Sequence, residues 1–172
     1  MRYIITGGPG SGKSTLIEAL KSEGYTCFDE VSRKIIAHQQ KIGGDLFPWG
    51  NLPGFAYACY ELMLEDVHQA PAGKICFYDR GIPDIAAYLK NRDLPVNSEY
   101  FDAIKYYQPI AFLCPPWEEI FINDAQRPES FELSKRLYFH LKQTYIESGA
   151  QMIELPMDSV EERLDIVLQV VK

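Results

Sequence analysis

The chain has 172 residues, of which 47% are hydrophobic, and its formal net charge at pH 7 is -7. We interpret residues 1–172 as a single globular domain, because this length and composition support one substantial core. The negative charge argues against nucleic acid as the main partner, since a phosphate backbone requires clustered lysine and arginine, and the apolar runs are too short for a membrane span.

An apolar run over residues 3–6 predicts a buried strand at the start of the chain. The segment that follows fits the phosphate-binding motif G-x-x-x-x-G-K-[ST], and residues 13–22 then show a helix pattern. Strand, glycine loop and helix in this order are the context that the motif requires. The predicted nucleotide-binding residues are Gly8, Pro9, Gly10, Ser11, Gly12, Lys13, Ser14 and Thr15.

Each residue type in this loop has a physical role. The glycines leave backbone N–H groups free to surround phosphate oxygens, and the helix dipole adds positive potential. Lys13 places a positive charge against the β- and γ-phosphates, and Ser14 offers a hydroxyl to Mg²⁺. The sequence therefore predicts ATP and Mg²⁺ as ligands.

Residues 25–28 predict a second strand, which ends at two carboxylates, Asp29 and Glu30. In open α/β sheets this carboxyl edge is where ligands bind, so Glu30 or Asp29 is the candidate general base. Asp29 and Arg33 are also candidate substrate contacts. The alternative is structural: Asp29 caps the next predicted helix, residues 31–38, and Glu30 pairs with Arg33.

Glycine, proline and aromatic residues over positions 39–55 predict an ordered but mobile loop, and helical spacing returns over residues 56–70. The aromatic side chains of Phe47, Trp49 and Phe55 either stack on an acceptor ring or form a small core of their own.

A third strand, residues 74–80, ends in Asp79 and Arg80, and apolar residues followed by aspartate are typical of a Walker B element that binds Mg²⁺. Arg80 is predicted to hold the acceptor or the transferred phosphate; its alternative is a salt bridge to Asp84. Asp84 begins a helix over residues 83–89, where it either binds acceptor hydroxyls or interacts with the helix dipole.

The remaining elements are a helix over residues 98–107, a strand over 109–114, a lid over about 117–131, a helix over 132–148 and a strand over 151–155. Ser159 and Glu162 predict a capping box at the start of a last helix. Arg127 in the lid is expected to close over the γ-phosphate, and Arg136 is the second choice; the alternative for both is a solvated charge on a helix surface.

Strands and helices alternate throughout, so the predicted fold class is α/β, with three layers and a mainly parallel sheet covered on both faces. Right-handed crossovers would bring the carboxylates together beside the loop.

The four cysteines show no metal-ligand spacing and indicate a reduced, cytoplasmic protein without disulfides.

The glycine loop, the Asp79-Arg80 pair and Arg127 together resemble the P-loop kinase branch of nucleoside, nucleotide and shikimate kinases. More narrowly, the chain resembles the AAA-labelled ATPase family that includes the ribosylnicotinamide kinase half of NadR. This resemblance implies a P-loop NTPase fold with five strands in the order 2-3-1-4-5 and a mobile kinase-type lid. The motifs do not identify the phosphate acceptor.

Two functions follow from these features. The first is a small-molecule kinase that transfers the γ-phosphate of ATP to a hydroxyl of a nucleoside-like or other metabolite. The second is a nucleotide-binding ATPase or regulatory module that has no acceptor. The expected partner is a small-molecule acceptor, and we expect neither nucleic acid nor a membrane as a partner. The expected oligomeric state is a monomer or a homodimer.

Overall fold

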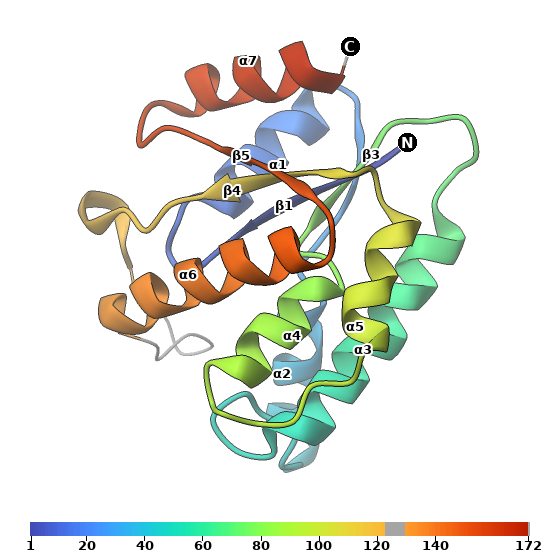
Figure 1. Ribbon diagram of the computed structural model, residues 1–172, viewed down its shortest axis with the longest axis vertical. Coiled ribbons are helices and arrows are strands. Elements are labelled where there is room, and N and C mark those ends of the chain that lie inside the picture. The colour runs from blue at the N-terminus through green and yellow to red at the C-terminus, as the bar shows by residue number, and fades with distance from the viewer. Residues whose placement is uncertain (123–129, 172) are drawn as a thin grey trace.

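The computed structural model describes residues 1–122 and 130–171, and its centre is a five-stranded sheet in the order β2-β3-β1-β4-β5 (Figure 1). All neighbouring strands are parallel, which confirms the predicted α/β class and strand order. The strands are β1 (Arg2–Gly7), β2 (Thr26–Phe28), β3 (Cys76–Asp79), β4 (Ile110–Cys114) and β5 (Gln151–Glu154).

Helices cover both faces of this sheet. On one face lie α1 (Lys13–Ser22) and α7 (Val160–Val171). The other face carries α2 (Val31–Ile42), α3 (Leu52–Gln69), α4 (Pro83–Lys90), α5 (Glu99–Asp102) and α6 (Phe131–Glu147). None of the helices in the described part of the chain is both long enough and apolar enough to cross a membrane.

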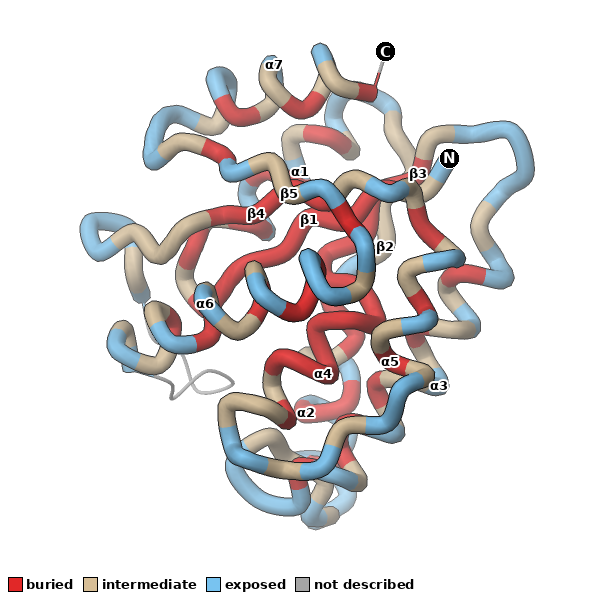
Figure 2. Tube along the Cα trace, viewed as in Figure 1, coloured by how far each residue is buried: buried red, intermediate tan, exposed pale blue. Residues whose placement is uncertain are grey.

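The central strand β1 divides the hydrophobic core into two parts. Tyr3 and Ile5 belong to the cluster beneath α1 and α7, whereas Ile4 belongs to the cluster beneath α3, α4 and α6. This alternation follows from the two-residue period of a strand, and burial on both faces explains why the run is apolar throughout. Figure 2 shows β1, β3 and β4 buried along most of their length, and the buried run that begins in β3 continues into α4.

The predicted loop over residues 39–55 is wrong at both ends. Helix α2 continues to Ile42 and stops at Gly43, whose φ of 68° is the left-handed conformation favoured at helix ends. Helix α3 begins at Leu52, and the side chain of Asn51 caps it by accepting a hydrogen bond from the backbone N–H of Gly54. The irregular segment is therefore only residues 43–51.

Two other boundaries differ from the sequence expectation. The helix expected over residues 98–107 is α5 followed by a 3₁₀ turn, Ala103–Tyr106, and a second 3₁₀ turn spans Glu118–Ile120 within the expected lid. Arg80 lies just past β3 rather than in it, with a φ of 76°. The expected cap at Ser159 is present, since its hydroxyl accepts from the N–H of Glu162 at 3.2 Å.

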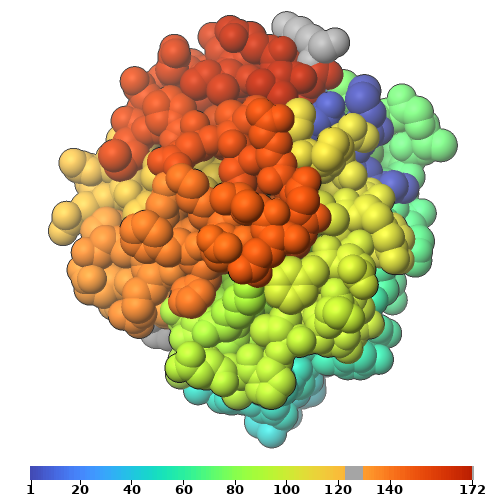
Figure 3. All heavy atoms as spheres, in the orientation of Figure 1, coloured from blue at the N-terminus to red at the C-terminus, as the bar shows by residue number. Residues whose placement is uncertain are grey.

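Helix α6 contacts both the sheet and helix α4. The side chain of Ser130 caps it by accepting from the N–H of Leu133 at 3.2 Å, and its inner face packs against α4. In the space-filling view the side chains of α6 lie directly against the segment that contains α4 and α5 (Figure 3). Leu137, Leu141 and Tyr145 are fully buried along this face.

Replacing Leu141, which is 0% exposed, by alanine should lower the free energy of unfolding by about 2–5 kcal/mol, because the change leaves a cavity between α6 and the sheet. The matched control is Ile146→Ala on the same helix, where the side chain is 52% exposed and the expected loss is about 0.5 kcal/mol or less. Urea unfolding of both variants measures the difference, and equal losses would contradict the described packing of α6.

Candidate functional site

The glycine loop lies between β1 and α1, as predicted. Gly10 and Gly12 have φ angles of 69° and 78°, a conformation that other residues adopt at a cost. The backbone N–H groups of Gly8, Gly10, Ser11 and Gly12 donate hydrogen bonds to no residue in the described part of the chain. Such a run of available donors at a helix N-terminus forms an anion-binding cradle.

Lys13 lies inside this cradle. Its side chain is buried, and the ammonium group donates to the carbonyl oxygen of Gly8 at 2.8 Å and contacts Ser11 Oγ at 3.4 Å. These contacts hold the charge over the loop, where a phosphate oxygen could replace the neutral acceptors. The hollow above the loop is lined by residues 10–15 together with Arg33, Trp117, Ile120, Ile122, Asp158, Ser159, Val160 and Arg163.

The loop is pinned by neighbours on both sides. The hydroxyl of Ser134 in α6 donates to the carbonyl of Pro9 at 2.8 Å, and a Cβ at Gly8 would lie 2.3 Å from that hydroxyl oxygen. On the other side, the guanidinium of Arg163 donates to the carbonyl of Ser11 at 3.1 Å. The loop therefore keeps its shape through α6 and α7 as well as through its own backbone.

Ser14 and Asp79 form the candidate metal position. Ser14 Oγ lies 3.5 Å from Asp79 Oδ2 at the end of β3, and the aspartate is buried. Hydroxyl and carboxylate oxygens are the donors that Mg²⁺ prefers, so the two residues fit this ion. Among the described residues no cluster of three or more His, Cys, Asp or Glu side chains could hold a metal.

Arg80 is buried and its backbone is strained. A φ of 76° is uncommon for a long side chain and points to a conformation that the surroundings impose. Its Nε donates to Glu30 Oε1 at 2.8 Å, and its Nη1 donates to the carbonyl of Gly7 at 3.0 Å and to Asp84 Oδ1 at 3.2 Å. Within the described chain, Nη2 makes none of these bonds, so one donor edge of the guanidinium remains available.

Asp84 is the acceptor at the centre of this network. Besides Arg80, its carboxylate accepts from Thr6 Oγ1 at 2.7 Å, from the N–H of Gly81 at 3.2 Å and from the hydroxyl of Tyr145. Burial and the charge of Asp84 raise the pKa of Tyr145, so its hydroxyl stays protonated and donates. Asp84 is therefore occupied in holding Arg80, and the salt bridge named as the structural alternative for Arg80 is present.

Glu30 stands at the mouth of β2 and is only 7% exposed. Its Oε1 accepts from Arg80 and also from Ser32 Oγ at 2.6 Å, while Oε2 lies 3.9 Å from Arg33 Nε. The structure thus contains the pair between Glu30 and Arg33 that was the structural alternative. It also turns the carboxylate of Glu30 toward a hollow, so pairing and a catalytic role are compatible.

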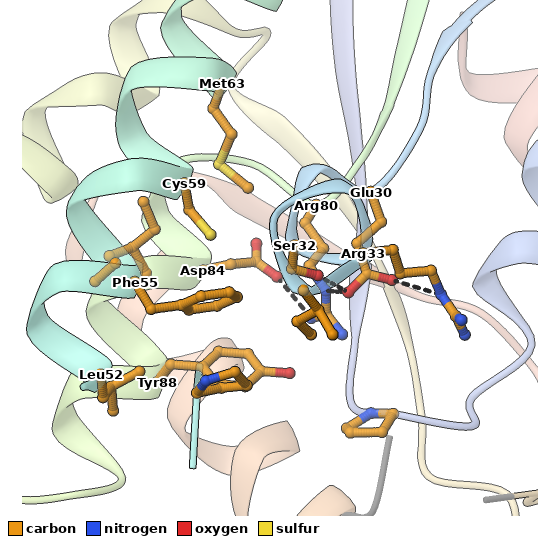
Figure 4. A pocket seen from close by; sticks show the side chains of 15 residues that line it. Glu30, Ser32, Arg33, Leu52, Phe55, Cys59, Met63, Arg80, Asp84 and Tyr88 are labelled. Atoms are coloured by element: carbon orange, nitrogen blue, oxygen red, sulfur yellow. Dashed lines mark hydrogen bonds and ion pairs between the residues drawn. The ribbon is translucent and has the colours of Figure 1, made fainter. Parts of the chain in front are cut away.

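This hollow lies between α2, α3 and α4, and Figure 4 shows the side chains that line it; we call it the acceptor hollow because the sequence analysis expects the phosphate acceptor beside Glu30 and Arg80. Its inner wall is apolar, and its polar end carries Glu30, Arg33, Arg80 and Asp84, two acids and two bases. Pro9 of the glycine loop also lines it, and Arg33 lines both hollows. The apolar wall consists of Ile36, Leu52, Phe55, Ala56, Cys59, Met63 and Ile85.

A third hollow adjoins the acceptor hollow. Pro48, Leu52 and Tyr88 line both of these hollows. The two charged residues that line the third hollow, Arg92 and Arg136, are exposed, and neither forms an ion pair with another described residue. Two of the three aromatic residues singled out in the sequence, Phe47 and Trp49, lie in the 43–51 segment, and Phe55 lies in α3; stacking on an acceptor ring stays a prediction. Phe47 and Trp49 stack on each other with ring centroids 5.2 Å apart, whereas Phe55 lines the acceptor hollow.

Asp29 is not part of this arrangement. Its carboxylate is 60% exposed and forms an ion pair with Lys21 at 2.6 Å, outside all three hollows. Nor does Asp29 cap α2, since the cap position is occupied by Glu30. Arg127, the predicted lid arginine, lies outside the described residues.

Sequence analysis missed Arg163. This arginine is 3% exposed and shares the buried face of α7 with Val167 and Val171, four and eight residues further on. A charged residue at a position that helical spacing assigns to the core was the available signal. The sequence around Arg163 did not indicate that this side chain would contact the glycine loop.

Solved structures share this fold. NadR in complex with NR aligns with a TM-score of 0.73 and 17% identity over 99% of this chain and 50% of that one. Deoxyadenosine kinase from M. mycoides with bound dATP aligns at 0.58 and 16% over 99% of both chains. Shikimate kinase from Acinetobacter baumannii with shikimate aligns at 0.60 and 19% over 99% of this chain and 91% of that one.

No curated protein sequence matches the chain significantly. A family model described as an AAA domain matches residues 2–163, which is most of the chain and includes the glycine loop, Asp79, Arg80 and Arg163. Because this model covers more than half of the chain, the chain belongs to the AAA domain family, and its fold is shared with the kinase structures named above.

Proposed function

We propose that the protein is a small-molecule kinase that transfers the γ-phosphate of ATP to a hydroxyl group of a metabolite. The observation that carries this proposal is the position of Pro9, which belongs to the glycine loop and also lines the acceptor hollow. A hydroxyl at the polar end of that hollow would lie beside the terminal phosphate. Kinases among the structures of similar fold support a phosphotransferase.

The triphosphate would occupy the cradle of the glycine loop. The open backbone N–H groups and Lys13 would bind its β- and γ-oxygens, and Arg127 is proposed to approach them from the lid. Ser14 and Asp79 would hold Mg²⁺, which supplies neutralisation of phosphate charge when bound. Phosphoryl transfer depends mainly on such positioning and charge neutralisation, so these residues account for most of the chemistry.

The transfer step would take place beside the hydrogen-bonded pair of Glu30 and Arg80. The acceptor oxygen forms a bond to the γ-phosphorus, the bond to the β,γ-bridging oxygen breaks, and ADP leaves. The carboxylate of Glu30 accepts the hydroxyl proton, a role that suits a nearly buried acid turned toward the hollow. The open Nη2 edge of Arg80 donates to the transferred group, while its other nitrogens stay fixed by Glu30, Gly7 and Asp84.

The residues that line the acceptor hollow and the hollow adjoining it indicate the kind of acceptor. An apolar wall with Phe55 suits a ring or another apolar body, and the balanced charges at its polar end suit a neutral hydroxyl. The adjoining hollow carries the positive charges of Arg92 and Arg136 without a carboxylate partner in the described chain. We therefore propose an acceptor that combines a hydroxyl, an apolar body and, at its far end, a negatively charged group.

Purified protein should release ADP from Mg-ATP only when a suitable acceptor is present. The assay is a screen of nucleosides, ribosylnicotinamide and hydroxylated metabolites, each paired with a phosphorylated or carboxylated counterpart. Release that depends on one acceptor and yields a phosphorylated product supports the kinase. Slow hydrolysis that is the same with every compound would instead support a nucleotide-binding regulatory module.

With the acceptor found in that screen, Glu30→Gln should lower kcat by about 100-fold or more, because the change removes the proton acceptor. The KM for ATP should stay the same, since Glu30 does not line the hollow above the glycine loop. Asp29→Asn is the matched control: it neutralises the adjacent, exposed carboxylate and should leave kcat unchanged. An equal fall in both variants would remove Glu30 from the mechanism.

Arg92→Gln and Arg136→Gln should each raise the KM for an anionic acceptor about tenfold, because one charge-assisted contact contributes roughly 1.4 kcal/mol or more. The KM for a neutral counterpart should hardly change. Lys135→Gln is the control, since Lys135 lies beside Arg136 in α6 but pairs with Glu132 and lines none of the hollows. A KM that rises equally for neutral and anionic acceptors would exclude charge recognition.

A further inference from the structure

Arg163 places a buried positive charge directly against the glycine loop. Helix α7, which carries it, lies beside α1 on one face of the sheet (Figure 1). The guanidinium donates from Nη2 to the carbonyl of Ser11 at 3.1 Å. Its Nη1 would be 2.6 Å from a Cβ at Gly12, so the group rests on the loop where glycine leaves room. Arg163 also lines the hollow above the loop.

This charge has no anionic partner in the described chain. Arg163 forms no ion pair with a described residue, and its Nε is buried without a hydrogen-bond partner. The thiol of Cys114 is close enough to feel the charge, but burial raises the pKa of that thiol, so it stays neutral. Burying an arginine without a compensating anion is unfavourable, and proteins rarely retain one without a reason.

The missing anion can be identified from the position of the charge. The loop that Arg163 contacts presents N–H groups without a partner among the described residues, and Lys13, to the hollow that Arg163 also lines, and all of these groups attract an anion. A polyphosphate in the cradle would bring several negative charges close to the guanidinium. Because the side chain of Arg163 is 3% exposed, the attraction would be screened less than between charges at the surface.

We propose that Arg163 is a positioning residue for the nucleotide, and that the bound triphosphate is the counter-charge of its buried guanidinium. In the empty protein the charge is uncompensated and weakens the packing of α7 on the loop; bound phosphate removes that penalty. Nucleotide binding and the docking of α7 are therefore coupled. The inference rests on the nucleotide-binding part of the proposed function and is independent of the acceptor.

A purely structural role makes the opposite prediction. If Arg163 served only to brace the carbonyl of Ser11, its loss would destabilise the empty protein, and any loss of nucleotide affinity would come from the altered loop and would not be restored by the charge of a lysine. If it is a counter-charge for phosphate, its replacement by an apolar side chain of similar length should spare the empty protein and weaken nucleotide binding.

The experiment compares Arg163→Met and Arg163→Lys with wild type, by thermal melting without nucleotide and by calorimetric titration with Mg-ATP. We expect Arg163→Met to raise the Kd for Mg-ATP at least about tenfold, while the melting temperature of the empty protein stays unchanged or rises. Arg163→Lys keeps the charge without the planar fork, so it should recover a large part of the affinity.

Arg2→Met is the matched control. Arg2 also donates to a backbone carbonyl, that of Tyr106 at 3.1 Å, and also has a buried Nε without a partner. It begins β1, however, at the end opposite to the glycine loop. Its replacement should leave the Kd for Mg-ATP unchanged, whatever it does to stability.

Several results would overturn the proposal. One is a Kd for Arg163→Met within about twofold of wild type; another is equally weak binding by Arg163→Lys and Arg163→Met, which would assign the loss to shape. An Arg163→Met protein that does not fold would also overturn it, because an uncompensated charge is not required for folding. If the wild-type protein itself binds no Mg-ATP, the proposed kinase function is excluded together with the role of Arg163. The first two results would exclude only the role of Arg163.

Discussion

The arrangement of the acceptor site depends on the burial of one guanidinium, that of Arg80. Burying an arginine is costly, and the cost falls when its charge is balanced and its N–H groups are satisfied. The chain provides these partners with Glu30 from the end of β2, the carbonyl of Gly7 from the end of β1 and Asp84 from α4. These groups are far apart in sequence, so the same contacts that satisfy Arg80 fix the polar end of the hollow.

The glycine loop is held from both faces of the sheet. Ser134 in α6 contacts it from the face that carries the acceptor hollow, and Arg163 in α7 contacts it from the other. Helix α6 also carries Tyr145, whose hydroxyl bonds to Asp84 in the Arg80 network. One rigid helix therefore links the phosphate loop to the acceptor site, so that a shift of α6 would disturb both.

The sequence predicted the features that rest on local patterns and failed where a residue's role depends on a distant partner. The glycine motif located the loop, and the strand ends located Glu30, Asp79 and Arg80; the strand order followed from a family resemblance. The polar residues at the end of α2 hid its last turn because they lack helical periodicity. The contact between Arg163 and Ser11 spans 152 residues, and no local pattern encodes such a partner.

The net charge of the chain, which argues against nucleic acid, does not argue against small anionic ligands. At physiological ionic strength exposed charges more than about 8 Å apart are largely screened, so acidic residues spread over the surface contribute little inside a hollow. Inside a hollow the nearby charges set the electrostatic potential. Lys13 and Arg163 at the loop are buried, and Arg92 and Arg136 line a concave surface. A large polyanion would meet the whole acidic surface, whereas a small one meets only the hollow. If the proposed function holds, we expect this distribution of residues to favour small anionic ligands over large polyanions.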